Sequence, residues 1–168
     1  MGAQRAPADL PDGFGVAVVR EDGKWRCAPM RKSALNSLSA AETELREIRS
    51  AGAVFGLLDV DDEFFVIVRP APAGTRLLLS DATAALDYDI AAEALEKLDA
   101  DIEADDLDDA DPFEEGDLGL LSDLGLPDAV LSVILDETDL YADEQIGRIA
   151  REMGFAEELS AVLDRLNR

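Results

Sequence analysis

The chain has 168 residues, of which 38 are acidic, 15 are basic and none is histidine, so its formal net charge is −23. A negative field of this size opposes binding to nucleic acids and to anionic membranes, because both partners require clustered Lys and Arg. We therefore expect no direct nucleic-acid binding, no membrane binding, and a protein partner with a basic surface. Apolar residues make up 48% of the chain, which is enough to form a core.

The cysteine and histidine content excludes several classes of site. Cys27 is the only cysteine, so one chain can form neither a disulfide nor a thiolate metal cluster. Without histidine there is no Ser-His-Asp or Cys-His arrangement and no His-ligated metal. We expect a protein that is not an enzyme and that uses no cofactor. Because no secretory signal or apolar run of roughly 18 to 20 residues is apparent, we also expect a cytoplasmic location.

The first half of the chain predicts strands joined by tight turns. Residues 1–13 are rich in Ala, Pro, Gly and Asp, and we expect a loose leader there. The Asp22-Gly23 pair lies between two apolar runs, a pattern typical of a β-hairpin. A second pair of strand-forming runs flanks Val60-Asp61-Asp62 and ends at Pro70. The expected strands are 14–20, 24–30, 53–59, 63–69 and 75–80.

Two helices are expected within the same region. Ser39, followed three residues later by Glu42, fits a capping box and predicts a helix from about 40 to 50. Apolar residues at helical spacing predict a second helix near residues 90–98. Residues 14–98 therefore form an α+β domain in this prediction, with an antiparallel sheet of about five strands and one or two helices. No sequence repeat of fixed period is apparent.

Residues 99–117, which we call the acidic segment, hold eleven acidic side chains and no basic one. Repulsion between like charges predicts a solvated linker. The segment serves either as a spacer or as a docking surface, since complementary charge steers association with a basic protein. Metal binding is not expected, because the glycine and distal glutamate of a calcium loop are missing. The candidate partner-binding residues are Asp105, Asp106, Asp108, Asp109, Asp111, Glu114 and Glu115.

Residues 118–168 show short amphipathic patterns, and Gly125 and Gly154 mark helix ends. Helices this short are not stable alone, so the pattern predicts a small C-terminal helical bundle.

A few other residues have both a functional and a structural interpretation. Ser80-Asp81 either activates a nucleophile or caps the following helix, and the missing base favours a cap. Cys27 lies in a strand-like run, which favours packing over reactivity. Trp25 and the Phe64-Phe65 pair fit core positions of strands better than an interface anchor.

The order of several motifs resembles a bacterial family of tRNA adenosine deaminase-associated proteins. Leu79-Ser80-Asp81 occupies the place of a Val-Ser-Asp-like tripeptide that ends the strand-rich part of that family. An acidic stretch follows, and then a Gly-Asp-x-x-Leu-Leu-x-Asp-Leu-Gly pattern opens the helical tail. The likeness runs from about Phe14 to the C-terminus. The matching positions of the last pattern are Gly116, Asp117, Leu120, Leu121, Asp123, Leu124 and Gly125.

The resemblance implies association with a tRNA-editing deaminase, because the family is named for neighbouring genes; it supplies no catalytic residues. A zinc deaminase needs a His or Cys ligand near a catalytic Glu and a Pro-Cys-x-x-Cys element, which this chain lacks. We therefore expect a non-enzymatic accessory or regulatory partner of a tRNA adenosine deaminase. One alternative is an acidic mimic that occupies the nucleic-acid site of an RNA-binding enzyme. Another is an enzyme that uses paired carboxylates.

Overall fold

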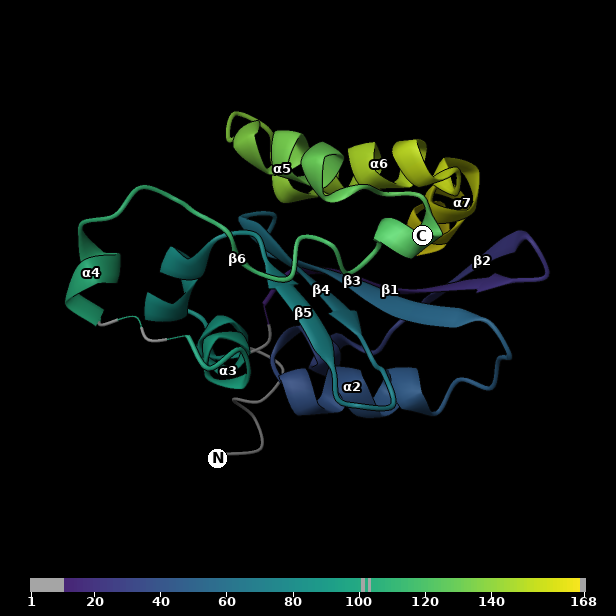
Figure 1. Cartoon of the computed structure of the whole chain (residues 1–168), viewed down its shortest axis with the longest axis horizontal. Helices are drawn as coiled ribbons and strands as arrows, with labels where there is room; N and C mark the ends of the chain where they lie inside the picture. The colour runs from purple at the N-terminus through teal and green to yellow at the C-terminus, as the bar shows by residue number, and fades with distance from the viewer. Residues whose placement is uncertain (1–10, 101, 103, 167–168) are drawn as a thin grey trace.

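The computed structural model describes residues 11–100, 102 and 104–166. Its centre is one antiparallel sheet with helices packed against both faces (Figure 1). This arrangement confirms the α+β class predicted from the sequence. Most of the predicted leader lies outside the described residues, and its last residue, Gly13, already belongs to the first strand.

In the described part of the chain the sheet has the strand order β2-β1-β3-β4-β5-β6, and every neighbouring pair is antiparallel. The first five strands match the predicted ones to within one or two residues. The last comes from the acidic segment, where no strand was predicted. The bounds are β1 (Gly13–Glu21), β2 (Lys24–Pro29), β3 (Ala53–Val60), β4 (Phe64–Arg69), β5 (Arg76–Leu79) and β6 (Glu115–Gly116).

Two tight turns fix the register of the long strands. Asp22 (φ 55°) and Gly23 (φ 75°) connect β1 to β2, and Asp61 (φ 54°) and Asp62 (φ 59°) connect β3 to β4. Positive φ at both central residues is what a type I′ hairpin turn requires, and aspartate tolerates this region better than most residues. Both predicted hairpins are confirmed.

One face of the sheet, the lower face in Figure 1, is covered by α2 (Leu38–Arg46) and α3 (Asp89–Lys97). The capping box predicted at Ser39 is wrong. Ser37 caps α2 instead, and its hydroxyl accepts the backbone N–H of Ala40 at 3.1 Å. The helix starts earlier because Leu38, only 3% exposed, belongs to its buried face. Each helix follows a short 3-10 helix, η1 (Lys32–Leu35) or η2 (Ala82–Leu86).

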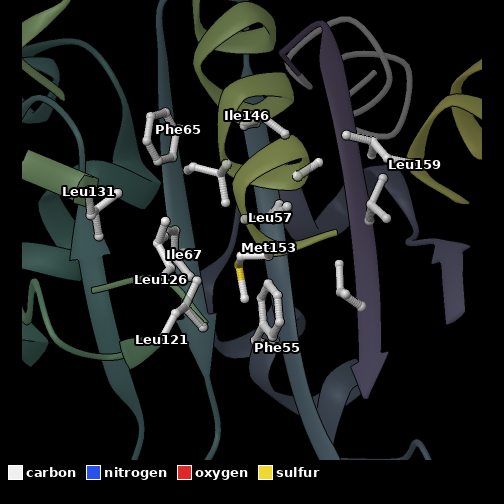
Figure 2. Packing of buried hydrophobic residues seen from close by; sticks show 14 of the residues in the cluster. Phe55, Leu57, Phe65, Ile67, Leu121, Leu126, Leu131, Ile146, Met153 and Leu159 are labelled. Carbon is white, nitrogen blue, oxygen red and sulfur yellow. The ribbon is translucent and has the colours of Figure 1, made fainter. Parts of the chain in front are cut away.

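The opposite, upper face is covered by α5 (Asp128–Asp136), α6 (Ala142–Met153) and α7 (Ala156–Leu166). Figure 2 shows their apolar side chains interdigitating with those of β3 and β4. The bundle predicted for residues 118–168 therefore does not form a core of its own. The helices share one core with the sheet, because the sheet offers a larger apolar surface than short helices offer one another. Labelled members are Phe55, Leu57, Phe65, Ile67, Leu121, Leu126, Leu131, Ile146, Met153 and Leu159.

Candidate functional site

The middle of the acidic segment projects from one end of the molecule, where α4 (Ala104–Asp108) lies (Figure 1). Leu107 is 5% exposed and anchors α4 to the lower core, beside η2. Of the predicted partner-binding residues, Glu114 and Glu115 are half-buried, and the exposed ones are Asp105, Asp106, Asp108, Asp109 and Asp111.

The end of the acidic segment is part of the sheet, so the solvated linker that we predicted does not extend over the whole segment. The backbone N–H of Ala82 donates to the carbonyl of Phe113 at 2.8 Å, and that of Asp117 donates to the carbonyl of Leu77 at 2.9 Å. Between these bonds, β6 pairs with β5. Backbone hydrogen bonds to a strand edge outweigh the charge repulsion here, since the glutamates at this edge retain contact with solvent.

The Gly-Asp-x-x-Leu-Leu-x-Asp-Leu-Gly pattern forms the turn that joins β6 to the upper helices. Two arginines of the sheet hold it. Arg69 makes a bidentate ion pair with Asp123, with Nη1–Oδ1 at 2.6 Å and Nη2–Oδ2 at 2.9 Å. Arg76 Nε lies 2.7 Å from Asp117 Oδ2. The guanidinium of Arg69 lowers the pKa of Asp123. The two aspartates of the pattern therefore have a structural function.

Gly116 of the same pattern is required by the close approach of β6 to β5. It has φ of 130°, and a Cβ atom there would lie 2.4 Å from the carbonyl oxygen of Leu77. Only glycine fits such a position without movement of the backbone.

A second acidic feature was not predicted: a pocket of about 640 Å³ beside the β3–β4 turn. Its lining includes the apolar side chains of Phe14 of β1 and Leu163 of α7, and the cation Lys32 of η1. Five carboxylates also line the pocket, and they come from the residue before β1, from the β3–β4 hairpin and from the first turn of α6. They are Asp12, Asp59, Asp61, Asp62 and Asp143.

Asp59 is the buried member of this group, with 2% of its surface exposed. Burial raises its pKa to about 7, and a hydrogen bond shared with the Asp62 carboxyl adds to the effect. Asp59 Oδ1 also accepts the backbone N–H of Asp62 at 2.8 Å, and Asp62 Oδ1 accepts that of Asp143 at 2.9 Å. Burial, together with Asp62, also raises the pKa of Asp143.

The carboxylate pocket can hold a proton near neutral pH, which is one requirement of a general acid. Its carboxylates, however, accept the backbone N–H groups of Asp12, Asp62 and Asp143, and Asp61 Oδ2 also accepts the Tyr88 hydroxyl at 2.7 Å. Among the described residues, no group of three or more acidic or cysteine side chains is arranged to hold a metal ion. The hydrogen bonds of this pocket connect the β3–β4 hairpin to the start of α6. One feature of the sequence indicates that Asp59 is buried. It continues the alternate positions of β3 occupied by Phe55 and Leu57, whose side chains belong to the upper core.

The remaining candidates have the structural functions that we predicted. Asp81 caps η2, and its Oδ1 accepts the backbone N–H of Thr83 at 2.9 Å. Cys27 is half-buried against the upper core, and burial followed by the charge of Glu158 raises its pKa to about 12. Trp25 packs in a tilted arrangement against the core ring of Phe155, at a centroid distance of 5.0 Å. Phe64 and Phe65 are fully buried.

Comparison with known proteins extends these observations. Residues 13–156 match the model of a family described as Rv3753c-like tRNA adenosine deaminase-associated protein. The chain belongs to this family. It is 81% identical over 173 residues to Protein Rv3753c of Mycobacterium tuberculosis (strain ATCC 25618 / H37Rv), and the alignment covers 100% of both chains. No solved structure matches. The family resemblance stated from the sequence motifs is thus confirmed.

No helix among the described residues combines the length and apolar character needed to cross a membrane.

Proposed function

We propose that this chain is a non-catalytic accessory protein of a tRNA adenosine deaminase, and that it contacts this partner through the exposed carboxylates around α4. The family description supports the association. The absence of histidine and the single, half-buried Cys27 support a non-catalytic role, because a zinc deaminase needs several such ligands.

The observation that carries the docking site is the anchoring of α4. A spacer needs charge and length but no fixed position. Here Leu107 is buried against the lower core, and the segment re-enters the sheet at β6. The chain between these two attachments lies at one end of the molecule (Figure 1), and its carboxylates at positions 105, 106, 108, 109 and 111 are exposed. Such an array complements a basic, RNA-binding surface.

The experiment is co-elution of the two purified proteins in size-exclusion chromatography at several salt concentrations. We expect a complex at low salt that weakens as salt rises, since exposed charges are screened. A variant that carries asparagine at the exposed positions 105, 106, 108, 109 and 111 should lose the complex. The matched control changes net charge equally by amide substitutions at other exposed positions: Glu47, Asp136, Asp139, Glu152 and Asp164. Loss of the complex in both variants would assign the effect to net charge alone and contradict the docking site.

The same array also suits an acidic mimic of nucleic acid, which would inhibit the partner. Competition separates the two functions. Added tRNA displaces a mimic from the deaminase, whereas an accessory subunit remains bound when tRNA is present. We expect a ternary complex of deaminase, tRNA and this chain, and release of the chain by stoichiometric tRNA would favour the mimic.

A further inference from the structure

The lower half of the fold contains a structural repeat. Two units each consist of an antiparallel strand pair, a 3-10 helix and a nine-residue α-helix: β1, β2, η1 and α2 in the first, and β4, β5, η2 and α3 in the second. They flank β3, which pairs with β1 on one side and β4 on the other. The outer strand of the first unit, β2, therefore corresponds to the outer strand of the second, β5.

The register of the two outer strands can be matched residue by residue. β2 ends at Pro29 and η1 begins at Lys32, while β5 ends at Leu79 and η2 begins at Ala82. In each unit, the residue after the strand donates its N–H to the inner strand. The distances are 2.7 Å for Met30 N to Gly15 O and 3.0 Å for Ser80 N to Phe65 O.

By position, Arg26 corresponds to Arg76, three residues before the strand end in each case. Their side chains lie on opposite faces of the sheet, because Trp25 and Cys27 beside Arg26 pack on the upper core, whereas Leu77 beside Arg76 packs on the lower core. On β5, the outer edge is occupied by residues 113–117, an extended acidic stretch, and Arg76 binds its Asp117. On β2, the outer edge is the end of the sheet, and no strand of the described residues pairs with it. Arg26 is exposed and makes no ion pair within the described part of the chain.

The outer edge of β2 presents backbone groups for a further strand. Backbone N–H and C=O groups of successive residues point alternately to the two sides of a strand. Because Met30 donates inward to β1, the groups of Trp25 and Cys27 point outward. Arg26 lies between these two residues and Lys24 precedes Trp25. Both cations are exposed, on an otherwise acidic protein.

We propose that the outer edge of β2 binds an extended acidic segment of a partner protein as an added antiparallel strand, in the way that β5 binds residues 113–117. Backbone pairing at Trp25 and Cys27 supplies the hydrogen bonds, and Arg26 and Lys24 select acidic side chains. A second copy of this chain is disfavoured, since an antiparallel pair of β2 edges brings the cations of the two strands together: Arg26 lies opposite Arg26 when Trp25 pairs with Cys27, and opposite Lys24 when Trp25 pairs with Trp25. The inference does not depend on which partner the acidic segment around α4 contacts.

The test uses the isotope-labelled full chain and a peptide with the sequence of residues 112–118 as the probe. We expect chemical-shift changes centred on β2, and slower hydrogen exchange of the Trp25 and Cys27 amides. A control peptide with lysine in place of its three acidic residues should bind more weakly. The variant Arg26→Glu should weaken binding of the acidic peptide about fivefold, the factor for one exposed ion pair. The matched control Arg49→Glu reverses an exposed charge elsewhere and should leave binding unchanged.

Three results would overturn the proposal. The first is that millimolar peptide causes no chemical-shift changes in β2, whether it causes none at all or only changes in β5. The second is equal binding of the acidic and lysine peptides. The third is a dimer of the chain in sedimentation, together with slow hydrogen exchange of the Trp25 and Cys27 amides in that dimer. This result would identify the occupant of the edge as a second copy.

Discussion

Replacement of Asp59 by asparagine tests the physical account of the carboxylate pocket. Asparagine has the same shape, keeps the oxygen that accepts the Asp62 N–H, and can donate to the Asp62 carboxyl as the protonated acid does. It carries no charge at any pH. The variant therefore removes the cost of ionising a buried carboxyl and leaves the hydrogen bonds of the hairpin in place.

The sign and size follow from the pKa of Asp59, which burial raises from 3.8 to about 7 in the folded protein. A raised pKa means that the folded state holds a proton which the unfolded state has lost, so stability falls as pH rises between these two values. Each pKa unit corresponds to about 1.4 kcal/mol, and some solvent relaxation reduces the total, so we expect a change of about 2–4 kcal/mol. The asparagine variant does not lose this stability as pH rises.

The assay is urea unfolding of wild type and Asp59→Asn at several pH values between 4 and 8.5. We expect the difference in unfolding free energy to move in favour of the variant by about 2–4 kcal/mol across this range. The difference between variants is used because other carboxylates also titrate. Asp87→Asn, at an exposed position before α3, corrects for the change in net charge. A difference between Asp59→Asn and wild type that is constant with pH would refute the reasoning.

Three further predictions concern the turn after β6 and the lone thiol. Gly116→Ala should destabilise by about 3 kcal/mol or more in thermal unfolding, because its Cβ meets backbone, whereas Gly23→Ala at an open turn should cost about 1 kcal/mol; equal losses would contradict this. Arg69→Ala should cost about 1–3 kcal/mol in urea unfolding, since it leaves a carbonyl and the Asp123 carboxylate without their donor. Its effect should shrink at acid pH, as protonation of Asp123 removes the pair, and a pH-independent effect would argue otherwise. Cys27, with its pKa raised to about 12, should react with iodoacetamide at pH 8 roughly a hundredfold more slowly in the folded than in the unfolded protein, and equal rates would refute its burial.

Local sequence patterns predicted the first five strands well, because turn signals mark the two hairpins that contain four of them. Asp22-Gly23 fixes the first hairpin through positive φ, and Asp61-Asp62 fixes the second in the same way. The boundary of α2 was missed because two serines, Ser37 and Ser39, both fit a cap. Only the burial of Leu38 decides between them.

The candidate sites divide in the same manner. The exposed carboxylates around α4 were predicted from charge density, which is a property of the sequence alone. The half-buried Glu115 in β6 was assigned to the same surface, because charge density does not show where a chain meets a strand edge. The raised pKa of Asp59 was not predicted, since it depends first on burial in the tertiary structure and also on the charge of Asp143, which lies 84 residues later in the chain.

By itself, the sequence determined the chemistry that this protein lacks, the excess of negative charge, and the local choice between strand, turn and helix. These properties depend on residue type and short-range spacing. The tertiary structure alone decided that the C-terminal helices pack on the sheet, that the acidic segment supplies a strand, and that β2 remains an open edge. An apolar stripe or an unpaired strand edge requires a partner surface, and which surface it meets depends on contacts between residues far apart in the chain.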